Sequence, residues 1–240
     1  MELYGCSVKT ETVMGREVVI ICPPEGTANG RWALKTEYLP AFPEVQDELV
    51  SRGYHLVHMK NRSRWNPPED TDARGELAQL LHEKYGLARK CVPIGMSCGG
   101  LQAILFGAKY PQYVSCMYLD APVVNFLSCP AGLGRGADGR AAMDEFTAAR
   151  GLTISDLLTY REHPQDKIPQ LLEANIPIFL ACGDNDHSCP YEENGKLIND
   201  YYEAHGGIIQ TVIKKGGGHH PHNLPDNTPI IDFILKYDKD

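Results

Sequence analysis

The sequence predicts an α/β fold in which helices cover a mostly parallel sheet, and it predicts a single domain over residues 1–240. The first observation is that short apolar runs alternate with helix-like stretches, as in strands joined by crossover helices. The second is that 240 residues with 42% hydrophobic content suffice for one sizeable core. Ligand sites of such sheets lie beyond the carboxyl ends of the strands, so the residues after each strand matter most.

The expected elements follow one another regularly as far as residue 120. Apolar runs predict strands at 18–22, 54–59, 91–95 and 114–119, and helix-like patterns predict helices at 43–52, 74–85 and 101–110. The rhythm then breaks within a segment of about 125–170, which contains helix-like pieces at 141–149 and 154–160. It resumes with strands at 177–182 and 208–213 and helices at 192–205 and 228–236. We expect the interruption to be a helical cap inserted over the strand ends.

Charge and hydropathy point away from two classes of partner. The formal net charge is −8 and the sequence has no basic run, whereas nucleic acids and anionic membranes require clustered Lys and Arg. No window is apolar for long enough to span a bilayer, and no basic segment precedes an apolar stretch at the start. The eight cysteines are scattered without a CxxC pair, which is typical of reduced thiols. We therefore expect a cytoplasmic protein with a small-molecule partner; the sequence does not indicate an oligomeric state.

The segment 91–100, CVPIGMSCGG, contains the candidate nucleophile. Its apolar run ends in a glycine-flanked serine, and a helix-like pattern follows at once. A serine on such a sharp strand-to-helix turn exposes its hydroxyl, and Gly95 and Gly99 allow the two chain segments to approach closely. We therefore expect Ser97 to be the nucleophile.

A serine hydroxyl needs a base, and the loop GGGHHPHN offers three histidines. His219 directly follows the glycine run and is the expected base. His220 and His222 are expected to brace the loop or to contact the substrate. Three histidines in four positions also suit a metal ion, but no upstream Cys or carboxylate motif completes a ligand set. We expect neither a metal nor another cofactor.

The base in turn needs a carboxylate, for which three aspartates at or just past strand ends are candidates. Asp186 is favoured because it lies far enough into its turn to reach back toward the histidine loop. Asp184 fits an Asx turn. Asp120 remains the rival acid, with a role in orienting the substrate or the insertion as the alternative. The order Ser97, Asp186, His219 is the one expected for a serine nucleophile on this kind of sheet.

The negative oxygen that forms when a serine attacks a carbonyl requires two N–H donors. The backbone N–H of Cys98 is expected to be one, because it follows the nucleophile. The second is expected from the loop after the strand 18–22, where two prolines without N–H leave residues 25–32. Trp32 is expected to line the pocket.

The motifs GMSCGG, GDNDHSCPYEENG and GGGHHPHNLPDNTPIIDFI together resemble the α/β-hydrolase superfamily over essentially the whole chain. The last two, with YLDAPV and the GRW near residue 30, are similar to a subgroup of small esterase-like hydrolases associated with carbohydrate breakdown, related to acetyl-xylan-esterase-type and prolyl-oligopeptidase-type enzymes. That subgroup tends to have Arg after the nucleophile, where this chain has Cys98, so substrate contacts made by such an Arg do not carry over.

The resemblance implies an α/β-hydrolase fold with a helical cap and a serine esterase that cleaves carboxylic esters through an acyl-enzyme. An acylated sugar is the substrate class it suggests. The residues by themselves predict only acyl transfer through a serine. A prolyl-oligopeptidase-like peptidase is the alternative enzyme, since it uses the same triad, and thioesterase and lactonase fit the same chemistry. A non-catalytic binding protein on this fold is the alternative outside the enzymes, although all three triad residue types are present.

Overall fold

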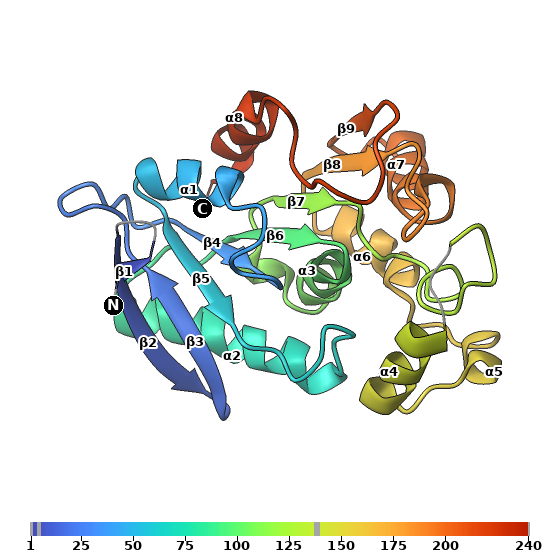
Figure 1. Ribbon diagram of the computed structural model, residues 1–240. Helices are drawn as coiled ribbons and strands as arrows, with labels where there is room; N and C mark the ends of the chain where they lie inside the picture. Colours follow the sequence, from blue (N-terminus) through green and yellow to red (C-terminus); the bar gives the residue numbers. More distant parts are fainter. Residues whose placement is uncertain (1, 4–5, 137–139, 240) are drawn as a thin grey trace.

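The computed structural model describes residues 2–3, 6–136 and 140–239. Within them the strands form one sheet of nine, in the order β1-β2-β3-β5-β4-β6-β7-β8-β9. The pairs from β5 to β9 are parallel, whereas β1, β2 and β3 join the sheet as antiparallel strands. Figure 1 shows the sheet crossing the molecule with helices on both faces. The predicted α/β class and mostly parallel sheet are confirmed.

The strands are β1 (Glu2–Leu3), β2 (Cys6–Val13), β3 (Arg16–Ile21), β4 (Trp32–Lys35), β5 (His55–Met59), β6 (Val92–Met96), β7 (Met117–Asp120), β8 (Ile178–Gly183) and β9 (Ile209–Lys214). The helices are α1 (Glu44–Ser51), α2 (Pro68–Tyr85), α3 (Cys98–Lys109), α4 (Arg140–Arg150), α5 (Ile154–Leu157), α6 (Ile168–Glu173), α7 (Gly195–Ala204) and α8 (Thr228–Tyr237). Short 3-10 turns occupy Pro111–Tyr113, Pro164–Lys167 and Tyr191–Glu193.

The main differences from the prediction lie near the N-terminus. Strand β2 is missing from the prediction because its sequence, CSVKTETV, is mostly polar, and most of it is not buried. Strand β4 is missing because it is only four residues long and includes Lys35, although all four are buried. Helix α2 begins at Pro68, before the expected start at residue 74, and proline is well suited to a first helical turn. The omission of β4 has consequences at the site.

The parallel strands are buried on both faces, which explains why they read as continuous apolar runs. In β8, Ile178 and Leu180 belong to one apolar cluster and Phe179 and Ala181 to another, because successive side chains point to opposite faces. The first cluster includes residues of α2, α3, α6 and α7, and the second includes residues of α1 and α8. Figure 1 shows these two sets of helices on opposite sides of the sheet. The two helix layers therefore bury both faces of the parallel strands.

Helices α4 and α5 lie beyond the carboxyl ends of the parallel strands, away from β1 and β2 (Figure 1). They contribute to a third apolar cluster that includes Phe126, Phe146 and Leu157. Arg64 joins α4 to the body of the molecule through Glu145, with N···O distances from 2.6 to 3.1 Å. The predicted insertion ends at about residue 170 and so includes the start of α6. In the structure α6 packs against α3, so this helix belongs to the layer that covers the sheet. No helix in the described part of the chain is both long and apolar enough to cross a bilayer.

Candidate active site

Ser97 occupies the single residue between the end of β6 and the start of α3, with φ 54° and ψ −122°. Positive φ is uncommon for a residue with a Cβ and indicates a conformation that the surroundings impose. Three hydrogen bonds hold this conformation. The Ser97 N–H donates to Asp120 O at 3.0 Å, and Ser97 O accepts from the N–H groups of Gly100 at 2.9 Å and Val123 at 3.1 Å. The turn thus places the serine side chain at the strand end, as the sequence predicts.

The tightness of the turn explains its glycines. A Cβ on Gly95 would lie 2.6 Å from the carbonyl oxygen of Gly99, and a Cβ on Gly100 would lie 2.3 Å from the Cβ of Pro122. At Gly99 the nearest atom, Thr36 Oγ1, would be 3.0 Å away. The close approach therefore depends most on Gly95 and Gly100, and less on Gly99 than the sequence predicts.

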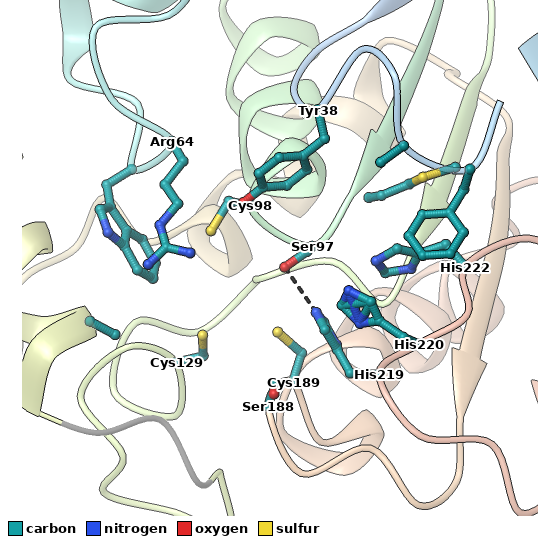
Figure 2. Close-up of a pocket in the computed structure, with 15 residues that line it drawn as sticks. Tyr38, Arg64, Ser97, Cys98, Cys129, Ser188, Cys189, His219, His220 and His222 are labelled. Atoms are coloured by element: carbon teal, nitrogen blue, oxygen red, sulfur yellow. Dashed lines mark hydrogen bonds between the residues drawn. The ribbon is translucent and has the colours of Figure 1, made fainter.

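Ser97, His219 and Asp186 form one hydrogen-bonded chain, of which Figure 2 shows the contact between Ser97 and His219. His219 Nε2 lies 3.0 Å from Ser97 Oγ, and His219 Nδ1 lies 2.8 Å from Asp186 Oδ2. Because a carboxylate only accepts, Nδ1 carries the proton and Nε2 accepts from the serine hydroxyl. Asp186 Oδ1 accepts the backbone N–H groups of Ser188 and Cys189 at 2.8 and 2.9 Å. Burial raises the pKa of Asp186, but these hydrogen bonds outweigh it and hold the pKa below its usual value.

The loops that carry the acid and the histidine are joined by direct contacts. The Asn185 N–H donates to Gly217 O at 2.9 Å, and the Gly216 N–H donates to Asp184 Oδ1 at 2.6 Å. A Cβ on Gly183 would lie 2.2 Å from Gly217 O, so only glycine fits at the end of β8. Asp184 Oδ1 thus accepts from an amide of the histidine loop, whereas the predicted Asx turn requires an amide that neighbours Asp184 in the sequence.

Asp120, the rival acid, is paired with a different histidine. Its Oδ1 accepts from His222 Nδ1 and from Lys214 Nζ, each at 3.0 Å, and its Oδ2 accepts from the Tyr118 hydroxyl at 2.9 Å and the Asn223 N–H at 2.7 Å. The carboxylate has no solvent exposure. Asp120, at the end of β7, therefore holds the part of the histidine loop around His222 and Asn223.

Electrostatics follow this arrangement. Burial raises the pKa of Asp120, but His222 and Lys214 outweigh it, so the pKa lies below its usual value. Burial lowers the pKa of His222, and the neighbouring carboxylate offsets this only in part. Nδ1 of His222 faces the Asp120 carboxylate, which only accepts, so Nδ1 carries a proton.

The site opens into a cavity of about 340 Å³. Its wall is formed by Tyr38, Ala41, Phe42, Arg64, Trp65, Met96, Ser97, Cys98, Cys129, Ala142, Ser188, Cys189, His219, His220 and His222 (Figure 2). The Arg64 guanidinium lies 5.1 Å from the centre of the Trp65 ring. Burial raises the pKa of the Cys98 thiol, which therefore stays protonated at neutral pH. The cavity is thus largely apolar and aromatic, with Arg64 as its principal cation.

Trp32 lies away from this cavity, contrary to expectation. It is fully buried at the start of β4, and its indole N–H donates to Ala88 O at 2.9 Å. The preceding loop is at the same end of the sheet, where the Asn29 N–H donates to Gly53 O at 3.0 Å. The reason is that β3 runs antiparallel to β5. The loop after β3 therefore lies at the amino ends of the parallel strands, opposite the site at their carboxyl ends.

The loop after the missed strand β4 reaches the cavity in its place. Tyr38, with φ 55°, lines the pocket, and a Cβ on Gly99 would lie 3.5 Å from the Glu37 backbone nitrogen. The loop therefore passes over the start of α3. His220 also lines the cavity, edge-on to Phe42 with ring centroids 5.5 Å apart. Sequence reasoning did not find Tyr38 or Arg64; recognising WALK as a buried strand is the signal that leads to Tyr38.

No protein-family model matches the chain. Among solved structures, it is similar to the Pyrococcus horikoshii acylaminoacyl peptidase, with a TM-score of 0.74 and 14% identity over 97% of this chain and 42% of that one. It is also similar to Thermogutta terrifontis esterase 2 phosphoramylated by tabun, with a TM-score of 0.68 and 14% identity over 99% and 97% of the two chains. Est1E from Butyrivibrio proteoclasticus gives a TM-score of 0.68 and 14% identity over 96% and 98%.

The chain thus spans about two fifths of the length of the peptidase and nearly all of each esterase. At these identities the likeness is one of fold. Together with the strand order and the serine turn, it shows that the chain has the α/β-hydrolase fold. That fold is shared by esterases and peptidases among these neighbours.

Proposed function

We propose that the protein is a serine hydrolase that cleaves small carboxylic esters through an acyl-enzyme. The observation that carries the proposal is the chain of hydrogen bonds from Asp186 through His219 to Ser97. A serine hydroxyl becomes nucleophilic when a base accepts its proton, and the base works best when a carboxylate fixes its tautomer. Both conditions are met at hydrogen-bonding distance and inside a cavity.

The first half-reaction follows from this geometry. Ser97 Oγ attacks the ester carbonyl as its proton passes to His219 Nε2, and the imidazolium that forms is stabilised by Asp186. The tetrahedral intermediate collapses when His219 returns that proton to the alkoxy oxygen, so the C–O bond breaks and the alcohol leaves. Water then attacks the acyl-Ser97 ester by the same proton route and releases the acid.

The oxyanion of the intermediate needs donors that are already in place. Cys98 is the first residue of α3, where backbone N–H groups lack an acceptor within the helix. The N–H of Tyr38, in the loop over the start of α3, is the second donor in this proposal, and it replaces the expected donor in the 25–32 loop. Removal of one such donor typically costs about 10²–10³ in kcat.

The cavity supports an ester with small substituents. About 340 Å³ accommodates a short acyl group and one ring, and Tyr38, Phe42 and Trp65 supply aromatic surface against which a sugar or aryl ring packs. Deacylation of an acylated sugar is therefore the specific activity we propose. The likeness to the acylaminoacyl peptidase supports a second candidate, hydrolysis of a peptide bond by the same groups.

A fluorophosphonate probe tests the nucleophile directly. Peptide mapping after incubation should find the label on Ser97, and Ser97→Ala should remain unlabelled. An active wild-type preparation without label on Ser97 would refute the mechanism.

A substrate screen tests the specificity. Short-chain p-nitrophenyl esters, acetylated sugars and feruloylated sugars are compared with a prolyl-peptide substrate. Turnover of the esters with little peptide cleavage is expected. Preferential peptide cleavage would favour the second candidate, and no turnover of any substrate together with no labelling would favour a binding protein.

A further inference from the structure

Three imidazole rings gather at one side of the cavity (Figure 2). The ring centroids are 4.8 Å apart for His219 and His220, 5.2 Å for His219 and His222, and 4.9 Å for His220 and His222. One ring nitrogen from each histidine lies within 4.8 Å of the other two. The catalytic proposal uses only His219, and the contact of His222 with Asp120 holds the loop without assigning a role to the three rings together.

Two of these rings are held in the form that binds metal ions. Asp186 accepts from His219 Nδ1, and Asp120 accepts from His222 Nδ1, so in each ring Nε2 carries the free lone pair. Both carboxylates are buried, with side-chain exposures of 1% and 0%. A metal-binding histidine usually donates its other ring N–H, here Nδ1–H, to a carboxylate. This hydrogen bond orients the ring and makes Nε2 more basic.

We propose that His219, His220 and His222 form a binding site for one divalent transition metal ion such as Zn²⁺, and that the bound ion inhibits the enzyme. The inhibition rests on the proposed function, whereas the binding does not. The ion takes the Nε2 lone pair of His219, which is the same lone pair that accepts the proton of Ser97. The serine hydroxyl then has no base.

The geometry requires a modest contraction. Zn–N bonds of about 2.1 Å in a tetrahedral site put the nitrogens about 3.4 Å apart. One nitrogen from each ring lies within 4.8 Å of the other two, so these separations must shrink by at most about 1.4 Å. His220 is the exposed member of the three, so its ring can shift more readily than those of His219 and His222. Ser97 Oγ or water completes the four ligands. The charge of Lys214 opposes a cation near Asp120, whereas the two carboxylates favour it.

Ligand type sets the selectivity. Imidazole nitrogens suit Zn²⁺, Cu²⁺ and Ni²⁺, whereas Mg²⁺ and Ca²⁺ prefer oxygen ligands. We therefore expect Zn²⁺ to bind and Mg²⁺ to have no effect.

Calorimetric titration of the full, chelator-treated chain with Zn²⁺ tests the binding without reference to activity. One Zn²⁺ per chain is expected. His220→Ala should weaken the Kd by at least about tenfold, and Asp186→Asn, which removes one supporting carboxylate, by about 10–100-fold. His205→Ala is the matched control, because it removes an exposed imidazole at the end of α7. Absence of Zn²⁺ binding by the wild type, or equal Kd values for wild type and His220→Ala, would overturn the site.

Fluorophosphonate labelling tests the inhibition. Zn²⁺ should protect Ser97 of the wild type from labelling, Mg²⁺ should not, and the protection should require at least about tenfold more Zn²⁺ in His220→Ala. Each variant is compared with its own metal-free rate, so any effect of the substitution on catalysis cancels. Binding of Zn²⁺ with undiminished labelling would leave the site in place and refute the inhibition. A chain that takes no label even without metal would instead contradict the proposed function.

Discussion

Two carboxylate–imidazole pairs in this protein use the same loop and nearly the same geometry, yet their surroundings differ. The His219–Asp186 contact is 2.8 Å and the His222–Asp120 contact is 3.0 Å. The His219 side chain is 15% exposed and its second nitrogen meets Ser97, whereas the His222 side chain is only 3% exposed. The difference teaches that such a pair acts as a base only where its free nitrogen meets a reactive hydroxyl.

The second pair is built for stability. Asp120 accepts hydrogen bonds from a lysine, a histidine, a tyrosine and a backbone N–H, and these partners come from β7, β9 and the loop that follows β9. Removal of one partner from this buried group lowers the free energy of unfolding, because it leaves an uncompensated charge or unsatisfied donors. Substitutions in the two pairs should therefore affect different properties, activity for one and stability for the other.

The largest effect is expected on removal of the base or the nucleophile. His219→Ala and Ser97→Ala should each lower kcat by up to about 10⁶-fold, because groups that act as a unit fail together. The double variant should be no slower than either single variant. Steady-state kinetics on the best ester from the screen measures this, and a double variant as slow as the product of the two single effects would contradict action as one unit.

Asp186→Asn should lower kcat by about 10⁴-fold, because the amide no longer favours the tautomer with a proton on Nδ1. Its effect on folding should be much smaller than that of the equivalent change at Asp120. If Asp120→Asn abolished turnover and Asp186→Asn did not, the roles of the two pairs would be reversed.

Asp120→Asn should instead lower the free energy of unfolding by about 3–5 kcal/mol, the usual cost of breaking a buried charged pair. Denaturant titration monitored by circular dichroism gives this value. The folded fraction should retain turnover, because the hydrogen bonds of the Asp120 side chain go to Tyr118, Lys214, His222 and Asn223. A stable variant with normal thermal unfolding would show that the Asp120 network contributes little.

The smallest effect concerns pH. Burial lowers the pKa of His222 despite Asp120, with His219 and Lys214 also disfavouring its charged form. Below about pH 6.5 the unfolded chain therefore binds a proton that the folded chain does not, so the free energy of unfolding falls as the pH decreases.

His222→Gln should flatten that decrease without removing it. Three other buried or half-buried histidines, His55, His58 and His163, have pKa values lowered by burial and contribute in the same direction. Melting temperatures measured from pH 7 to pH 5 in metal-free buffer provide the comparison, and an unchanged slope in the variant would show that His222 does not contribute.

The sequence by itself determined the α/β class and the positions of Ser97, Asp186 and His219. Those features are local: a strand that runs into a glycine-flanked serine, and turns that directly follow apolar runs. Since parallel strands end at one edge, residues after separate strands come together without knowledge of the loops. The structure accordingly joins these three side chains in one hydrogen-bonded chain.

Only the tertiary structure decided which aspartate meets which histidine and which loop covers the serine. The sequence favours Asp186 as the partner of His219, but it leaves Asp120 as a rival and does not indicate that Asp120 pairs with His222. The order of β7, β8 and β9 puts Asp120 beneath His222, and the antiparallel direction of β3 takes Trp32 to the opposite edge. Strand direction and order are set by pairing between distant segments, so periodicity within one segment does not determine them.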